Sequence, residues 1–195
     1  MTNASVITAT DGRGRCAWAG TDAEYRRYHD EEWGTALHGD RALYEKMSLE
    51  GFQAGLSWIT ILRKRPAFRE AFAGFDPEVV AHFSDADVER LMQNAGIVRN
   101  RLKIQAAISN ARVVLEMAPG ELDELMWSFA PAVRTHPLAT LAEVPAVTPE
   151  SEAMSKTLRK RGFRFVGATT MYALMQSSGM VDDHVVGCWR ARAAH

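Results

Sequence analysis

One carboxylate stands inside an otherwise apolar run, at Glu50 in the stretch LEGFQAGLSWIT that covers residues 49–60. Helical spacing puts Glu50 on the same face as Leu43 and Met47. An ionised carboxylate on an apolar face is costly unless a cation or several hydrogen-bond donors meet it. The sequence therefore leaves two interpretations open. Either Glu50 pairs with a structural arginine, or it lies in a pocket for a cationic or donor-rich ligand.

The only two cysteines each have a histidine nearby in the sequence. Near one end of the chain, Cys16 lies thirteen residues before His29. Near the other end, His184 lies four residues before Cys188. Two thiolates and two imidazoles suit a tetrahedral Zn²⁺ site that joins the ends of the chain, and four protein ligands make such a site structural. The alternative is two buried cysteines and two unrelated histidines.

Positive charge is concentrated in one late segment of the chain. No acidic residue lies between Glu152 and Asp182. The basic residues of this interval are Lys156, Arg159, Lys160, Arg161 and Arg164. The stretch GFRFVG, with Gly162 and Gly167 at its ends, predicts a tight turn between two helices, and the backbone amides after it, including that of Thr169, can face an anion. This favours a helix-hairpin-helix that grips a DNA backbone. The alternative is a basic last turn that complements a helix dipole.

Composition limits the class of protein. The chain has 195 residues, 47% of them hydrophobic, and a net charge of −1, so we expect one domain whose nucleic-acid surface, if present, is local. A signal peptide and an apolar run of roughly 18 residues are both missing, which predicts a cytoplasmic protein without membrane contact. We expect a loose tail over residues 1–14, a single two-lobed domain over 15–190 and a second tail over 191–195.

Helical periodicity covers most of the chain, and no period-two alternation competes with it, so the predicted fold class is all-α. Asp40 is expected to cap the helix that carries Glu50, and Pro66 to begin the next one. A long helix is expected to start after Asn100, and another at Thr148-Pro149.

Together these motifs resemble the DNA-3-methyladenine glycosylase I family of the helix-hairpin-helix superfamily. The resemblance runs from Arg15 to Cys188 through RCAW, YHDEEWG, LEGFQAGLSWIT, AGIVRNRLKIQAAISNA, RGFRFVG and DHVVGC. It implies a two-lobed helix-hairpin-helix glycosylase fold whose termini are joined by one structural Zn²⁺ per chain. It also implies a monofunctional enzyme that flips 3-methyladenine out of double-stranded alkylated DNA and hydrolyses its N-glycosidic bond, releasing the free base. We expect a monomer.

The resemblance also implies roles for particular side chains. It assigns base binding and catalysis to Glu50, Tyr28 and Trp58, and it makes Trp18 and Trp33 further walls of the base pocket. Near the gap left by the flipped nucleotide, the turn at Gly55 and Leu56 would act as a wedge. The residues expected to contact the DNA backbone are Lys160, Arg161, Gly162, Arg164, Gly167 and Thr169, and the expected zinc ligands are Cys16, His29, His184 and Cys188.

The expected mechanism depends on charge. Methylation at N3 makes adenine a cation, so stacking on Tyr28 and Trp58 gains a cation–π interaction of roughly 0.5–2 kcal/mol. The Glu50 carboxylate would accept a hydrogen bond from the exocyclic amine and pair with the positive ring, whereas neutral adenine would leave a buried anion at a cost of about 3–5 kcal/mol. The base is then a good leaving group for attack by water, and no covalent lysine is needed.

Some points stay open at the level of sequence. MVDDH supplies Asp182, where the family more often has Asn, so the role of Asp182 and Asp183 is open, as is activity on 3-methylguanine. A zinc deaminase would use His29 and Glu31 as H-x-E, but its P-C-x-x-C motif is absent. A DNA-binding module without catalysis explains the basic hairpin but gives Glu50 no role.

Overall fold

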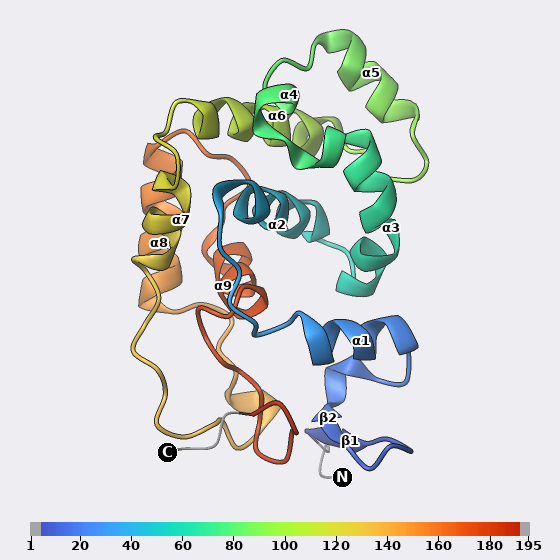
Figure 1. The fold of residues 1–195 in the computed structure, drawn as a ribbon, viewed down its shortest axis with the longest axis vertical. Coiled ribbons are helices and arrows are strands. Elements are labelled where there is room, and N and C mark those ends of the chain that lie inside the picture. The colour runs from blue at the N-terminus through green and yellow to red at the C-terminus, as the bar shows by residue number, and fades with distance from the viewer. Residues whose placement is uncertain (1–4, 192–195) are drawn as a thin grey trace.

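The computed structural model describes residues 5–191, and these are mostly helical. Figure 1 shows the helices wrapped around one central helix. The helices are α1 (Ala23–Glu31), α2 (Asp40–Gln53), α3 (Trp58–Ala71), α4 (Pro77–Val80), α5 (Asp85–Gln93), α6 (Arg101–Leu115), α7 (Glu121–Trp127), α8 (Pro149–Lys160) and α9 (Ala168–Ser177). Within the described range, no helix is long and apolar enough to cross a bilayer.

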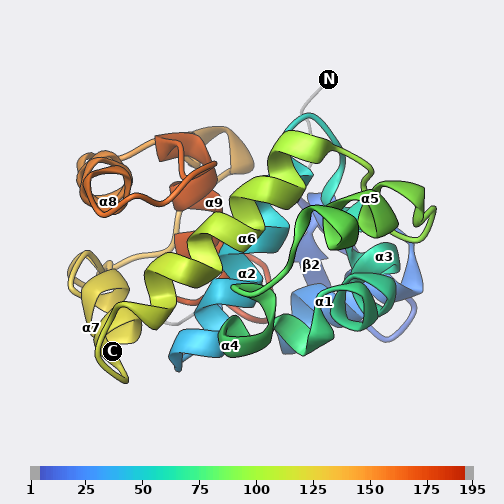
Figure 2. The same cartoon turned by 90° about the horizontal axis from the view of Figure 1, so that it is seen from above.

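Helix α2 is the central element and packs against α3, α6, α7 and α9. Every residue from Lys46 to Phe52 is buried, so this part of α2 meets protein on all sides. Gly51 lets the chain at Phe165 lie close to α2, because a Cβ added at Gly51 would lie 3.4 Å from Phe165 Cβ. Figure 2 shows α7, α8 and α9 on one side of the α2–α6 pair, with α1, α3 and α5 on the other.

A short antiparallel hairpin departs from the all-α expectation. Strands β1 (Val6–Thr8) and β2 (Gly14–Cys16) pair with Val6 opposite Cys16. The expectation of a loose tail is wrong for residues 5–14, because Gly12 turns the chain at a φ of 77° and Val6 packs against the cluster that holds Cys16. Residues 1–4 and 192–195 of the expected tails lie outside the described part of the chain.

Two predicted helix starts are wrong. Gly39, not Asp40, is the N-cap of α2, and the Asp40 carboxylate instead accepts from the backbone amides of Gly120 (2.7 Å) and Asp123 (2.9 Å) at the start of α7. Pro66 lies inside α3, because one buried face continues across it. The predicted start of α6 is confirmed, since Asn100 accepts from the amide of Lys103 at 3.2 Å. The start of α8 is also confirmed, with Thr148 in a capping box.

Candidate active site

A pocket of about 420 Å³ opens between α1, α2, the start of α3 and α9. Its walls are Trp18, Tyr25, Tyr28, Trp33, Glu50, Gln53, Trp58, Leu141, Val144, Ala173, Gln176, Ser177 and Asp183. The five residues that the sequence assigns to a base pocket, Trp18, Tyr28, Trp33, Glu50 and Trp58, are all among them. Segments far apart in the chain thus bring one carboxylate together with four aromatic rings.

The aromatic walls support one another. The ring centroid of Trp18 lies 5.1 Å from that of Tyr25 and 5.0 Å from that of Trp33. On the other side, the Tyr28 and Trp58 centroids are 5.6 Å apart. Tyr28 is only 1% exposed, so its position is set by packing. A flat ligand would therefore find rings already in place, with little side-chain ordering left to occur on binding.

Glu50 is 4% exposed and lies at the pocket wall. Its Oε1 accepts a 2.8 Å hydrogen bond from the Ser177 hydroxyl on α9. Burial raises the pKa of Glu50 from 4.5 to about 7, and the charge of Lys46 and the bond from Ser177 only partly offset this. At neutral pH the carboxyl group is therefore poised between its two states, and a cation in the pocket would favour the charged one.

Lys46 is a charged neighbour of the pocket rings that the sequence analysis missed, although it does not line the pocket itself. Its ammonium lies 5.3 Å from the Tyr28 ring centroid and 5.5 Å from that of Trp58. The spacing of four residues between Lys46 and Glu50 on one helix was the available signal. Ser177 was also missed, and no signal pointed to it, because α9 reaches Glu50 only through tertiary packing.

The two aspartates after α9 have different surroundings. Asp183 is 1% exposed, lines the pocket, and accepts from the Tyr172 hydroxyl and the Gln176 amide, each at 2.7 Å. It also pairs with Arg134. Asp182 instead accepts from Nδ1 of His184 at 2.7 Å. The pocket therefore contains a second carboxylate, and that carboxylate is already surrounded by donors.

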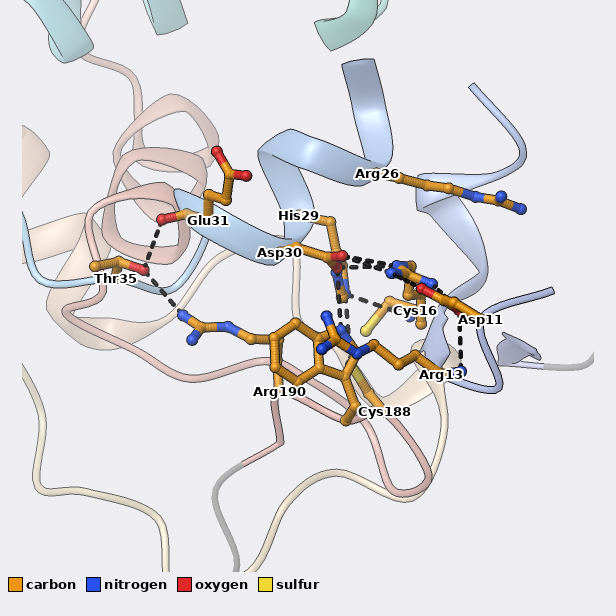
Figure 3. Close-up of polar contacts among 12 residues, drawn as sticks. Asp11, Arg13, Cys16, Arg26, His29, Asp30, Glu31, Thr35, Cys188 and Arg190 are labelled. Carbon is orange, nitrogen blue, oxygen red and sulfur yellow. Dashed lines mark hydrogen bonds and ion pairs between the residues drawn. The ribbon is translucent and has the colours of Figure 1, made fainter. Parts of the chain in front are cut away.

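A separate cluster forms where the two ends of the chain meet (Figure 3). The side-chain ligand atoms of Cys16, His29 and Cys188 all lie within 4.8 Å of one another, and all three residues are buried. Nε2 of His29 is 3.4 Å from Sγ of Cys188. The Cys16 thiol donates to Cys188 and so lowers the pKa of that thiol. A buried thiolate with thiol and imidazole neighbours is a donor set that suits a soft divalent metal.

His184, the fourth expected ligand, lies beside this cluster rather than within it. Its ring centroid is 5.1 Å from that of His29, and its buried Nε2 has no hydrogen-bond partner among residues 5–191. Each histidine binds an aspartate through Nδ1, His29 to Asp30 at 2.8 Å and His184 to Asp182 at 2.7 Å. In each ring, Nε2 is thus the nitrogen left free of a carboxylate.

An ion-pair network surrounds the cluster. Arg15, 6% exposed, binds the carboxylates of Asp11 and Asp30, with shortest distances of 2.7 and 2.6 Å. Trp189 donates to Asp30 at 3.1 Å, so the chain after Cys188 packs back onto α1. Burial acts to raise the pKa of Asp30, but the bonds from Arg15 and His29 prevail and lower it to about 2. Asp30 is thus held as a carboxylate against His29.

The turn after α2 carries Gly55 and Leu56, the residues that the sequence predicts to act as a wedge. Gly55 has a φ of 86°, which favours glycine, and Leu56 beside it is 40% exposed. Lys103 donates to the backbone oxygens of Phe52 (2.9 Å) and Ala54 (2.7 Å), which ties down the end of α2. Leu56 therefore projects from an anchored turn close to the pocket residue Gln53, whose amide donates to the Leu56 carbonyl at 2.6 Å.

The predicted turn between two helices is confirmed at α8 and α9. Gly162 has a φ of 95°, Gly167 is the N-cap of α9, and Thr169 is exposed in its first turn. The side chain of Asn110 on α6 holds the turn, because it donates to the Arg164 carbonyl at 3.0 Å and accepts from the Arg164 amide at 2.8 Å.

The basic side chains of this turn are not equivalent. Lys160 and Arg164 are exposed. Arg161 is exposed too, but it forms an ion pair with Glu121 at the start of α7. The charge of Arg161 is therefore partly neutralised within the protein, whereas those of Lys160 and Arg164 face solvent.

Comparison with known proteins identifies the family. The family model described as methyladenine glycosylase matches residues 18–191. The chain is 51% identical over 179 residues to DNA-3-methyladenine glycosylase 1 of Escherichia coli, covering 89% of this chain and 95% of that one. It is 48% identical to DNA-3-methyladenine glycosylase of Haemophilus influenzae, covering 89% of this chain and 96% of that one.

Solved structures agree in fold. A crystal structure of 3-methyladenine DNA glycosylase I superposes with a TM-score of 0.86 at 47% identity, covering 91% of this chain and all of that one (100%). The enzyme of Staphylococcus aureus, solved to explain 3-methyladenine recognition, superposes with a TM-score of 0.85 at 33% identity, covering 93% and 98%. By sequence and by fold, this chain belongs to the methyladenine glycosylase family.

Proposed function

We propose that this chain is a monofunctional DNA glycosylase that hydrolyses the N-glycosidic bond of 3-methyladenine in alkylated duplex DNA. The observation that carries the proposal is the buried carboxylate of Glu50 in a pocket walled by aromatic rings. The family membership and the names of the relatives support the same reaction. Alkylated double-stranded DNA as partner, free 3-methyladenine as product, a monomeric state and a cytoplasmic location are parts of this proposal.

Discrimination between damaged and normal bases follows from charge. The flipped 3-methylated base is a cation, and between Tyr28 and Trp58 it gains roughly 0.5–2 kcal/mol from cation–π attraction. The bound cation also favours the ionised state of Glu50. Because the pKa of Glu50 is near 7, this carboxyl group can lose its proton when the cation binds. Neutral adenine offers no such compensation for a buried anion. Base release would then rely on orientation and on attack by water.

The DNA surface in this proposal has two parts. Leu56, on its anchored turn, would fill the space that the flipped nucleotide leaves in the duplex. Lys160 and Arg164, with the amides at the start of α9, would bind phosphates in the manner of a helix-hairpin-helix. Because Arg161 is paired with Glu121, we assign it a smaller share than the sequence alone gives it.

The cluster at the chain ends fits a structural Zn²⁺. Cys16, His29 and Cys188 converge, and His184 supplies a buried Nε2 that has no hydrogen-bond partner within the described part of the chain. Both histidines have a carboxylate on Nδ1, the arrangement that orients imidazole ligands toward a metal. A bound Zn²⁺ would hold the two ends of the chain together, and four protein ligands would leave it no catalytic position. Asp182 accordingly serves to orient His184, and we assign it no part in the chemistry.

Chromatography of bases released from methylated duplex DNA tests the proposed reaction. Incubation with the protein should release 3-methyladenine as the free base while leaving adenine in the strand. The same chromatogram separates 3-methylguanine, and so answers whether that base is also removed. Tight binding to the duplex without any released base would contradict the proposal and favour a binding module.

A further inference from the structure

The protein itself supplies a cation, Lys46, whose charge acts on the Glu50 carboxylate. Lys46 is 8% exposed and lies one helical turn before Glu50 on α2, and both residues belong to the buried segment 46–52. The Lys46 ammonium faces the rings of Tyr28 and Trp58 at 5.3 and 5.5 Å from their centroids. Lys46 therefore lies behind the aromatic wall against which a base would stack.

Lys46 also borders a second, smaller cavity of about 240 Å³ behind the pocket. That cavity is lined by the charged side chains Glu32 and Arg65 as well, and Ser177 lines both cavities. Burial lowers the pKa of Lys46, and the nearby charges of Glu50 and Glu32 act against this. The carboxylate of Glu32 in the smaller cavity thus helps to keep the Lys46 ammonium charged. The same ammonium faces the Tyr28 and Trp58 rings of the pocket.

The charge in the pocket changes during the proposed reaction. When the glycosidic bond breaks, its electron pair stays with the base, so the cationic base leaves as neutral 3-methyladenine. Water adds its hydroxyl to the sugar and releases one proton. Before binding and after bond cleavage, the pocket therefore holds no cation from the substrate. Without a cation from the protein, an ionised Glu50 would then be a buried anion with no opposite charge nearby.

We propose that Lys46 is the resident counter-ion of Glu50, which keeps that side chain partly ionised at neutral pH when the pocket is empty or holds the neutral product. The inference rests on the proposed function, because only a base that changes its charge makes a resident counter-ion useful. Lys46 acts on Glu50 through its charge rather than through a hydrogen bond. It is a positioning residue, because it lines the smaller cavity and not the pocket in which a base would stack.

Other groups also face Glu50. Ser177 on α9 donates to it. Tyr25 and Tyr28 on α1 also lie near it, because burial and the charge of Glu50 both raise the pKa of each tyrosine. Asp183 lines the same pocket, where it is paired with Arg134. The charge of Lys46 lowers the pKa of Glu50, so removal of that charge should raise the midpoint of the Glu50 titration.

The test is a titration of Glu50 itself. Protein labelled with ¹³C at glutamate side-chain carboxyls is titrated by NMR, and Glu50→Gln identifies the Glu50 signal. In Lys46→Met the midpoint should rise by about one pH unit or more, whereas Lys46→Arg should restore it. Lys64→Met is the matched control, because Lys64 on α3 bonds the Ala95 carbonyl away from the pocket, and it should leave the midpoint unchanged.

Kinetics supply a second readout. Because the methylated base carries a fixed charge, the acid limb of kcat/KM reports on the enzyme, and in Lys46→Met it should move to higher pH. At pH 6 the variant should be about 10-fold slower than the wild type, and near pH 9 the two should converge. A merely structural role would lower the rate equally at all pH values. If Lys46→Met does not fold, Lys46→Gln removes the same charge with a polar group.

An unchanged Glu50 midpoint in a folded Lys46→Met or Lys46→Gln protein would overturn this inference. If the wild-type protein released no base at any pH, that result would overturn the proposed function instead. The NMR midpoints do not depend on that activity, so the two failures are distinguishable.

Discussion

The hydroxyl of Ser177 on α9 donates a 2.8 Å hydrogen bond to the Glu50 carboxylate on α2, and this contact joins residues 127 positions apart. Ser177 thus donates directly to Glu50 in the pocket wall. The bond favours the ionised form of a side chain whose burial raises its pKa to about 7. The reactivity of the pocket at neutral pH should therefore be sensitive to this one hydroxyl.

Ser177→Ala should move the acid limb of base excision to higher pH. A hydrogen bond to a charged group contributes about 1.5–3 kcal/mol, so the rate at pH 7 should fall by about 10-fold and recover near pH 9. Single-turnover rates across this pH range are the measurement. Ser178→Ala is the matched control, because the Ser178 hydroxyl bonds the Leu174 carbonyl at 2.6 Å. A pH-independent loss in Ser177→Ala would contradict this explanation.

Glu50 should also lower the stability of the fold at alkaline pH. Its pKa rises on folding from 4.5 to about 7, so the neutral form is favoured in the folded state. The stability that protonated Glu50 contributes is full below pH 4.5 and is lost as the pH rises through 7. At pH 8 the free energy of unfolding of Glu50→Gln should therefore exceed that of the wild type by about 1–3 kcal/mol. Urea unfolding at pH 5 and pH 8 measures this difference, and equal differences at both pH values would refute it.

The purified protein should contain about one zinc per chain by elemental analysis. His184→Ala should lose the metal and lower the Tm by about 5 °C or more, because the ends of the chain are then no longer joined. His82→Ala is the control, since Nδ1 of His82 bonds the Glu78 carbonyl outside the cluster. Full stability of the metal-free wild-type protein would contradict a structural zinc site.

Charge reversal at the hairpin should weaken binding to all DNA sequences alike. Lys160→Glu or Arg164→Glu removes a phosphate-binding cation, so the slope of log K against log salt should flatten by about 0.9 for each phosphate that is no longer neutralised. Arg161→Glu should flatten it less, because Arg161 is paired with Glu121. Arg90→Glu on α5 is the control, and Figures 1 and 2 show α5 on the opposite side of the molecule from α8. A sequence-dependent loss at Lys160 would argue against backbone recognition.

Local signals in the sequence predict much of this molecule. Helical periodicity and capping residues predict the start of α6 at Asn100, and glycine spacing predicts the turn between α8 and α9. A costly carboxylate in an apolar run singles out Glu50. Each of these signals lies within a few residues of the feature that it predicts, and this explains why they can be read without a structure.

Long-range pairings could not be predicted in the same way. Asp40 was expected to cap its own helix, yet it caps α7, because its carboxylate meets the amides of Gly120 and Asp123 only after folding. Strand β1 is too short to show alternation and is stabilised by pairing with β2. Whether Lys46 faces solvent or the pocket rings is set by the packing of α1 and α3 against α2.

The central claim is that the Glu50 carboxylate carries recognition of the methylated base. Its most direct test is the single-turnover release of 3-methyladenine from methylated duplex DNA by Glu50→Gln, with Glu45→Gln on the same helix as control. We predict a release rate at least about 100-fold below wild type with DNA affinity little changed, since Gln keeps the shape but not the charge. Release by Glu50→Gln at the wild-type rate would contradict the account.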